Sequence, residues 1–246
     1  MKLSVLMPSF NEKDTLLELL QKVRSVPVDM EIILIDDAST DGTRQLIQKK
    51  VEGRHENLKV IYHEKNLGKG SAIRSGLKHA SGEVVIIQDA DLEYDPQDYL
   101  KILKPFEANG TCVVYGTRFQ GAGPFRFIKH WFANRFLGKK YEIKRFDHFF
   151  GIQFLNFLVN TLYGAAITDE ATCYKAFRRE IFDKISLRCV GFEFCPEVTA
   201  KVLKAGYKIT EVPISYRPRS YKEGKKLNWR HGVEAISALI KYRFVD

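Results

Sequence analysis

Asp89 and Asp91, separated only by Ala90, are the residues whose types and spacing point most clearly to chemistry. They follow the apolar run 84–88, which predicts a buried strand. Two carboxylates there are costly unless a cation compensates them, and Mg²⁺ and Mn²⁺ prefer oxygen ligands and often bridge to a phosphate. Ligands of open α/β sheets bind beyond the carboxyl ends of the strands. The pair therefore predicts a metal-diphosphate site, although acidic turns are common and the pair alone is weak evidence.

A second acidic group follows an earlier apolar run. Asp36 and Asp37 come directly after residues 31–35, and Asp41 stands before a helical pattern. Carboxylates at a strand end accept hydrogen bonds from a base N–H or from ribose hydroxyls, so we assign Asp36 and Asp37 mainly a ligand role. We assign Asp41 mainly to helix capping, the commoner role of Asp at that place.

The segment 66–71 opens another helical pattern with Gly68, Lys69 and Gly70. Glycines permit close backbone approach, and a helix N-terminus attracts anions. The segment does not match the P-loop pattern, and the chain has no G-x-G-x-x-G fingerprint. An anion site and a simple turn at the start of a helix therefore remain alternatives here.

The elements that position these residues alternate along the first half of the chain. Strands are predicted at 3–7, 31–35, 58–62, 84–88 and 113–116, with helical patterns at 16–23, 43–51, 71–79 and 96–106. This rhythm predicts a mostly parallel α/β sheet with helices on both faces. The pattern changes near residue 120 at a Gly-rich breaker, and a strand at 209–216 and a helix at 233–242 follow. We expect one domain, 1–246, with a divergent second half.

Composition and charge narrow the function classes. The chain has 246 residues, 45% of them hydrophobic and 28% charged, which is typical of a globular protein. No signal peptide or spanning segment is predicted, and four cysteines without CxxC spacing suggest reduced thiols and a cytoplasmic location. The net charge of +9 is uneven: residues 1–123 carry 16 Lys and Arg against 18 Asp and Glu, and residues 124–246 carry 23 against 12. The second half therefore suggests an acidic partner, whether nucleic acid, anionic lipid or a phosphorylated substrate.

Five motifs in order carry a resemblance to a known family. They are Pro8-Ser9-Phe10-Asn11-Glu12, Asp36-Asp37 with Asp41-Gly42-Thr43, Asn66-Leu67-Gly68-Lys69-Gly70, Asp89-Ala90-Asp91 and Tyr115-Gly116-Thr117-Arg118-Phe119. Together they resemble family 2 glycosyltransferases of the GT-A fold, in particular the dolichyl-phosphate mannosyltransferase and polyprenyl-phosphate sugar transferase branch. The resemblance covers nearly the whole chain.

The resemblance implies roles for individual residues. It implies that the nucleoside is held by Pro8, Phe10, Glu12, Asp36 and Asp37. It also implies a nucleotide-binding half at 1–119. It implies that Asp89 and Asp91 hold Mg²⁺ or Mn²⁺ together with the donor diphosphate. Ala90 and Lys69 are also expected to bind the donor. Glu93 falls where some relatives have Gln, so its role stays open.

The second half, 120–246, is implied to bind the acceptor. Residues 168–175 resemble the family's Thr-Asp-x-Glu-Thr-Cys-Tyr-Lys segment, but Glu170 stands one position earlier than the pattern expects, whereas Lys175 matches. Residues 216–229 resemble a basic loop that closes over substrate. Residues 125–166 interleave cations with aromatics, which suits peripheral contact with a membrane, although helices packed on the sheet give the same pattern.

The expected reaction is inverting transfer of a sugar from GDP-mannose or a UDP-hexose to a polyprenyl phosphate. A phosphate is already largely ionised near neutral pH, so it needs orientation more than a base. The candidates for orienting it are Arg118, Lys175, Arg217 and Arg219. Asp91 is expected to support departure of the diphosphate.

Several alternatives stay open. A family 2 enzyme acting on a saccharide hydroxyl would need a base, for which Glu170 is the candidate. A nucleotidyltransferase, a catalytically inactive sugar-nucleotide binder and a nucleic-acid-binding protein rank lower; no recognised nucleic-acid module is present. A membrane-protein partner is also possible.

Overall fold

The computed structural model describes residues 1–108, 110–119, 144–219 and 229–245. Its strands are β1 (Leu3–Ser9), β2 (Met30–Asp36), β3 (Leu58–Tyr62), β4 (Val84–Ile87), β5 (Val113–Thr117), β6 (Lys175–Arg178) and β7 (Ile209–Pro213). Its α-helices are α1 (Leu16–Arg24), α2 (Thr43–Lys50), α3 (Lys69–Leu77), α4 (Tyr99–Leu103), α6 (Lys144–Tyr163), α7 (Ile181–Lys184), α8 (Phe194–Lys204) and α9 (Trp229–Phe244). Short 3₁₀ turns, η1 (Pro96–Asp98) and η2 (Lys104–Glu107), flank α4.

The strands form one seven-stranded sheet in the order β3-β2-β1-β4-β6-β5-β7. β1, β2, β3 and β4 are parallel to one another, and β5 is parallel to β7. Only β6 runs antiparallel to its two neighbours among the described strands. The prediction of a mostly parallel α/β sheet is therefore confirmed. The short strand β6 and helices α7 and α8 were not predicted.

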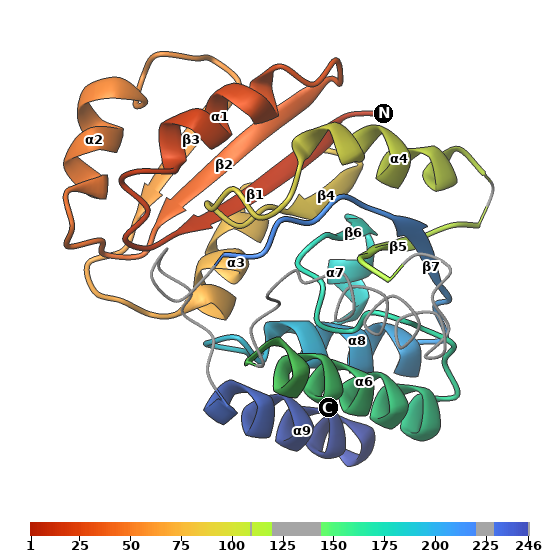
Figure 1. The fold of residues 1–246 in the computed structure, drawn as a ribbon. Coiled ribbons are helices and arrows are strands. Elements are labelled where there is room, and N and C mark those ends of the chain that lie inside the picture. Colours follow the sequence, from red (N-terminus) through yellow and green to blue (C-terminus); the bar gives the residue numbers. More distant parts are fainter. Residues whose placement is uncertain (109, 120–143, 220–228, 246) are drawn as a thin grey trace, which may run out of the picture.

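Helices cover both faces of this sheet (Figure 1). α3 packs on β1 and β2, and α4 packs on β5 and β7. In the second half, α8 lies next to the sheet with α6 and α9 beyond it, and these three helices pack on one another (Figure 1). Because the sheet takes strands from both sides of residue 120, the change of sequence pattern there does not divide it. The expected division into donor and acceptor halves stays a prediction.

The register brings the polar strand ends to one edge. Ser9 lies opposite Asp36, and Leu6 lies opposite Ile87, so the segments after β1, β2 and β4 emerge side by side. The runs behind them are apolar and almost completely buried, as parallel strands covered on both faces should be. The edge is therefore a rigid platform for the acidic residues that follow each strand.

A buried polar network fixes the end of β4. Gln88 is fully buried, and its Oε1 accepts hydrogen bonds from the hydroxyls of Tyr99 at 2.5 Å and Tyr174 at 2.7 Å. Its Nε2 donates to the carbonyl of Asp89 at 3.1 Å. Because each polar group has a partner, the network holds the backbone of the Asp89 segment at little desolvation cost.

The start of α3 packs against the loop that precedes α8. The amide of Gly70 donates to the carbonyl of Gly191 at 3.0 Å, and the amide of Ser71 donates to that of Val190 at 3.0 Å. The same loop is held from behind by Glu197, whose carboxylate accepts hydrogen bonds from the amides of Arg188 and Cys189. A Cβ at Gly70 would lie 2.9 Å from Sγ of Cys189 and 3.0 Å from its carbonyl carbon.

We therefore expect Gly70→Ala to lower the free energy of unfolding by about 1–3 kcal/mol, the usual cost of overpacking. Gly151→Ala is the matched control, because a Cβ at this exposed position in α6 meets nothing within 4 Å. It should be neutral or stabilise by up to about 1 kcal/mol through helix propensity. Urea unfolding of the two variants checks this, and equal effects would contradict close packing at Gly70.

Candidate functional site

Asp89 is held by an internal cation. One of its carboxylate oxygens forms an ion pair with the ammonium of Lys69, the first residue of α3. Burial alone would raise the pKa of Asp89, but Lys69 outweighs this effect and the pKa is lowered. Lys69 also lies 3.7 Å from Sγ of Cys173. The structure thus brings Lys69 and Asp89 together, as their joint assignment to the donor side requires.

Arg219 lies among three carboxylates from two parts of the chain, the segment after β1 and the segment after β4. Its Nη2 donates to Oδ2 of Asp91 at 2.6 Å, its Nη1 donates to Oε2 of Glu12 at 3.1 Å, and its Nε lies 3.6 Å from Oε1 of Glu93. Burial raises the pKa of Asp91 to about 7, and the carboxylates of Asp89 and Glu93 add to the rise, while Arg219 opposes it. Among the described residues, Arg219 is therefore a cation that offsets the mutual repulsion of these carboxylates.

The residues around Arg219 have the ligand atoms that a divalent metal ion prefers. Carboxylate oxygens from Glu12, Asp91 and Glu93 converge on one cationic group, and all-oxygen donors suit Mg²⁺ and Mn²⁺. In the described part of the chain, no three or more His, Cys, Asp or Glu side chains form a group arranged to hold a metal ion as they stand. The guanidinium is the cation that these carboxylates hold in this structure.

Glu93 ties the segment 215–219 to this edge. Its carboxylate accepts hydrogen bonds from the hydroxyl of Tyr216 at 3.0 Å and from the amide of Arg219 at 2.9 Å. Its backbone carbonyl accepts one from the amide of Arg217 at 2.8 Å. The predicted strand 209–216 ends instead at Pro213, and Tyr216 forms an isolated bridge with Tyr94. These bonds place Arg219 at the carboxylates and leave the side chain of Arg217 exposed.

The residues predicted to hold the nucleoside lie at the ends of β1 and β2. Pro8 and Phe10 are half-buried there. Asp36 is fully buried, and its Oδ2 accepts a hydrogen bond from Nε of Arg44 at 2.6 Å. Asp37 accepts hydrogen bonds from the amides of Leu67 and Gly68.

Asp37 also has a third partner. Its Oδ1 lies 2.7 Å from Nδ1 of His63. Asp37 therefore fixes the 66–68 loop in place. The contact of Asp36 and Asp37 with a nucleoside stays a prediction.

Two open questions about helix starts have structural answers. Asp41 precedes the N-cap residue Gly42, and its Oδ1 accepts hydrogen bonds from the amide of Thr43 at 2.9 Å and from its hydroxyl at 2.5 Å. Asp41 is therefore not the N-cap residue itself, but its side chain accepts the first amide of α2 from the position before Gly42. At the glycine loop, the amides of Gly70 and Ser71 donate to protein carbonyls. This arrangement favours the alternative of a packed turn over an anion site.

Arg118 forms a two-pronged ion pair. Its Nε and Nη2 donate to the two oxygens of Asp169, each at 2.7 Å, and its amide donates to the same carboxylate at 2.9 Å. Its guanidinium carbon lies 4.9 Å from the ring centre of Tyr216. Asp169 is fully buried, so the pair is a fixed part of the protein. It stands beside the segment that carries Arg219.

The structure does not bring Lys175 and Glu170 to this edge. Lys175 is fully buried; its ammonium donates to the carbonyl of Glu170 at 2.6 Å and lies 3.7 Å from the ring centre of Tyr115. The carboxylate of Glu170 is buried beside Thr199, and burial raises its pKa. Lys175 is therefore not placed to orient an acceptor phosphate, nor Glu170 to act as a base, in this structure.

Sequence reasoning missed three residues of the site. Asp169 stands next to the residue that was weighed as a base, yet it is the one that pairs with Arg118. The anchoring role of Glu93 and the position of Tyr216 between Glu93 and Arg118 were also missed. The available signals were the resemblances at Glu93, at residues 168–175 and at residues 216–229, because contacts across 51 residues (Arg118 to Asp169) and 123 residues (Glu93 to Tyr216) leave no local pattern.

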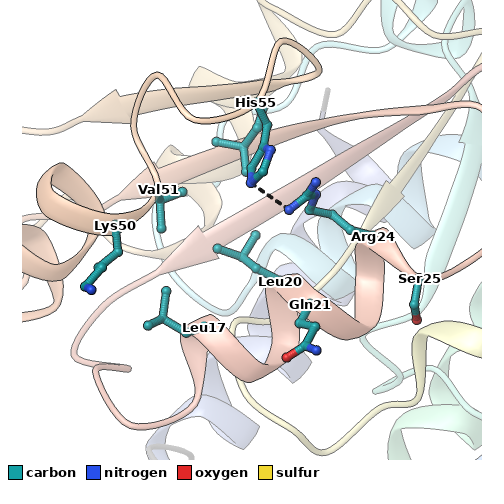
Figure 2. A pocket seen from close by; sticks show the side chains of 9 residues that line it. Leu17, Leu20, Gln21, Arg24, Ser25, Lys50, Val51 and His55 are labelled. Carbon is teal, nitrogen blue, oxygen red and sulfur yellow. Dashed lines mark hydrogen bonds between the residues drawn. The ribbon is translucent and has the colours of Figure 1, made fainter.

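Two surfaces lie away from these carboxylates. A cavity of about 360 Å³ opens near the amino ends of the strands, between α1 and the α2–β3 connection (Figure 2). In it Arg24 contacts Nε2 of His55 at 2.6 Å. It contains none of the predicted site residues.

On α6, Phe150, Phe154 and Phe157 are 55%, 49% and 63% exposed, and their spacing puts them on one helix face. The cations predicted at 129–140 and at 222–226 lie outside the described residues. Within the described segments, no helix combines the length and the apolar character that a membrane crossing requires.

Comparison with curated proteins gives relatives over most of the chain. It is 29% identical over 231 residues to a dolichol-phosphate mannosyltransferase of Pyrococcus furiosus, with 92% of this chain and 59% of that protein covered. It is 27% identical over 228 residues to an undecaprenyl-phosphate 4-deoxy-4-formamido-L-arabinose transferase of Salmonella choleraesuis, covering 91% of this chain and 62% of the relative. The chain thus spans about three fifths of the length of these relatives.

Solved structures show the same fold. A glucosyl-3-phosphoglycerate synthase from Mycobacterium tuberculosis, solved with Mn²⁺, uridine diphosphate and phosphoglyceric acid, matches with a TM-score of 0.70 at 16% identity. The match covers 100% of this chain and 79% of that one. The same enzyme has been solved with Mg²⁺ and uridine diphosphate. These likenesses confirm the predicted GT-A fold.

A family model assigns the sequence directly. The model described as glycosyl transferase family 2 matches residues 4–186, which include all five motifs from Pro8 to Phe119 and the 168–175 segment. Because the match covers most of the chain and ends well beyond the carboxylate site, the chain belongs to glycosyl transferase family 2.

Proposed function

We propose that this protein transfers a hexose from a nucleotide-sugar to a polyprenyl phosphate, with inversion at the anomeric carbon, at the cytosolic face of a membrane. The observation that carries the proposal is the convergence of Glu12, Asp91 and Glu93 on one cationic group at the carboxyl edge of the sheet. The names of the two curated relatives support a polyprenyl-phosphate acceptor.

On the donor side, Asp89 and Asp91, together with Glu12 and Glu93, would hold Mg²⁺ or Mn²⁺, which supplies charge stabilisation to the departing diphosphate. Lys69, which already pairs with Asp89, adds a positive charge on the same side. The strand ends carrying Pro8, Phe10, Asp36 and Asp37 lie along the same edge, where a nucleoside would extend from the diphosphate. The carboxylates of Asp36 and Asp37 would accept hydrogen bonds from guanine as well as from uracil. Both GDP-mannose and a UDP-hexose therefore remain in the proposal as donors.

On the acceptor side, a phosphate monoester needs orientation and charge neutralisation rather than a base. Arg118 is preorganised by Asp169, and Arg217 is exposed and directly follows Tyr216, whose ring Arg118 faces. The acceptor oxygen would form the bond to the anomeric carbon while the bond to the diphosphate breaks. The buried position of Glu170 counts against a saccharide hydroxyl as acceptor, because that reaction would need a base.

A lipid acceptor requires contact with a bilayer, and the outer helices offer a surface for it. Phe150, Phe154 and Phe157 form one exposed face of α6, and α9, which packs against α6, exposes Phe244 next to Arg243. Exposed rings beside cations suit the boundary between head groups and acyl chains. We propose peripheral association through this face, with or without a membrane-protein partner.

The transfer reaction is tested with purified protein, Mg²⁺ or Mn²⁺, a polyprenyl phosphate and labelled GDP-mannose, UDP-glucose or UDP-GlcNAc in parallel. Metal-dependent label in the organic phase from one donor is the expected result. Asp91→Asn should lower turnover at least about 100-fold, because it removes a carboxylate that would hold the metal ion at the leaving diphosphate, and should leave the fold intact.

Asp14→Asn provides the matched control, because Asp14 is exposed two residues after Glu12. It should retain full turnover. Full activity of Asp91→Asn would contradict the metal assignment. Absence of label from every donor, with nucleotide still bound, would favour a water-soluble acceptor.

Arg118 should act on the acceptor. Arg118→Ala leaves the buried Asp169 carboxylate unpaired, which costs about 3–5 kcal/mol, so the double variant Arg118→Gln with Asp169→Asn is the better test. We expect the KM for polyprenyl phosphate to rise about tenfold or more, the effect of losing a charge-assisted hydrogen bond, with the KM for the donor within about twofold. A selective loss of donor binding would refute this role.

Vesicle binding should depend on the exposed α6 face. Changing Phe150, Phe154 and Phe157 together to Asn removes three rings, each contributing up to about 1.5–3 kcal/mol on burial, so co-sedimentation with anionic vesicles should fall more than tenfold. Leu100→Asn, at an exposed apolar position on α4, is the control and should bind like the unchanged protein. Equal binding by the triple variant would exclude this face.

A further inference from the structure

Arg219 meets three carboxylates at once. One guanidinium carries a single positive charge, and it meets the carboxylates of Glu12, Asp91 and Glu93. The side chain is only about one sixth exposed, and its Nε is buried without a hydrogen-bond partner among the described residues. The guanidinium of Arg219 therefore matches the three carboxylates closely but incompletely, because its Nε–H finds no acceptor among them.

A divalent ion would match the same carboxylates better. It brings two positive charges in a smaller volume, and hard cations take several carboxylate oxygens at once. The guanidinium and the ion cannot both occupy the space between these oxygens, since Nη2 lies 2.6 Å from Asp91 and Nη1 lies 3.1 Å from Glu12. Binding of one must therefore displace the other.

We infer that Arg219 is a built-in counter-ion of the metal-binding carboxylates, and that a divalent ion and Arg219 compete for them. In the metal-free protein Arg219 holds the acidic residues together and is itself withheld from any acceptor phosphate. Metal binding releases the guanidinium on the segment whose Tyr216 ring faces Arg118. The donor metal thereby makes a second arginine accessible beside Arg118.

The hydrogen bonds of segment 215–219 couple it to the release of Arg219. The amides of Arg217 and Arg219 and the hydroxyl of Tyr216 all donate to Glu93, through its carbonyl or its carboxylate. The amide of Ser215 donates to Oδ2 of Asp98 at 2.5 Å. A metal ion that draws on the Glu93 carboxylate removes two of these bonds directly. The inference rests on the proposed function only for the identity of the metal-binding residues.

The test is binding of Mn²⁺ alone, measured by the EPR signal of free Mn²⁺, to the full chain and to Arg219→Ala. The apparent affinity of a site that is free for only a fraction of the time falls by that fraction, so we expect Arg219→Ala to bind Mn²⁺ about tenfold more tightly. Arg217→Ala removes the same charge two residues away and is the matched control, expected within about twofold of the unchanged protein. An unchanged or weaker affinity in folded Arg219→Ala overturns the inference.

Two further readouts keep the test decisive. Arg219→Lys retains the charge and loses the planar fork, so it should bind Mn²⁺ several-fold more tightly, and it decides the matter should Arg219→Ala not fold. In the unchanged protein, Mn²⁺ should increase amide deuterium uptake of a peptide spanning 214–219; added protection there contradicts displacement. Neither donor nor acceptor is used, so a negative transfer assay and a negative Mn²⁺ result are distinguishable.

Discussion

The structure depends on charge compensation at the carboxyl edge of the sheet. Apolar strands buried on both faces end there in acidic residues, and a carboxylate at such a place is stable only with a cation or with hydrogen-bond donors. Each of the acids has such partners: Asp36 has Arg44, Asp37 has the 66–68 loop and His63, Asp89 has Lys69, and Asp91 has Arg219. The partners come from the helices and loops around the sheet, so this one requirement ties those segments to the platform.

That requirement explains how the site of the proposed transferase can be stable before a ligand binds. A site that must hold two phosphates and a metal ion has to concentrate charge of both signs, and concentrated charge of one sign destabilises the folded state. At the reacting centre, an internal ion pair solves this problem only if a ligand or a metal ion can replace one of its two partners. The Arg118–Asp169 pair is of the other kind: its acid is fully buried and its fork is satisfied at 2.7 Å, so it serves as fixed structure.

Much of this arrangement was predictable from sequence because it follows from local patterns. The parallel strands appear as continuous apolar runs, and acids directly after a run must emerge at the carboxyl edge; Asp36 and Asp89 were located in this way. β6 was missed because four residues that begin with Lys175 and end with Arg178 show no strand pattern. Between Asp169 and Glu170, one residue of offset decides which acid meets Arg118 and which is buried beside Thr199, and no local rule settles that choice.

Lys175 and Arg219 show the limit of assigning basic residues by type. Both were candidates for the same task, yet the ammonium of Lys175 is enclosed by the ring of Tyr115 and the carbonyl of Glu170, whereas the guanidinium of Arg219 reaches the acidic edge. Burial of a lysine is tolerated where a carboxylate, a carbonyl and an aromatic face surround its charge, and the carboxylate of Glu170 lies 3.9 Å from this ammonium. An arginine suits the exchangeable position, because the planar fork that pairs with carboxylates pairs equally well with a phosphate. The same geometry that holds Arg219 on Asp91 and Glu12 therefore equips it for an anionic substrate once those carboxylates take another cation.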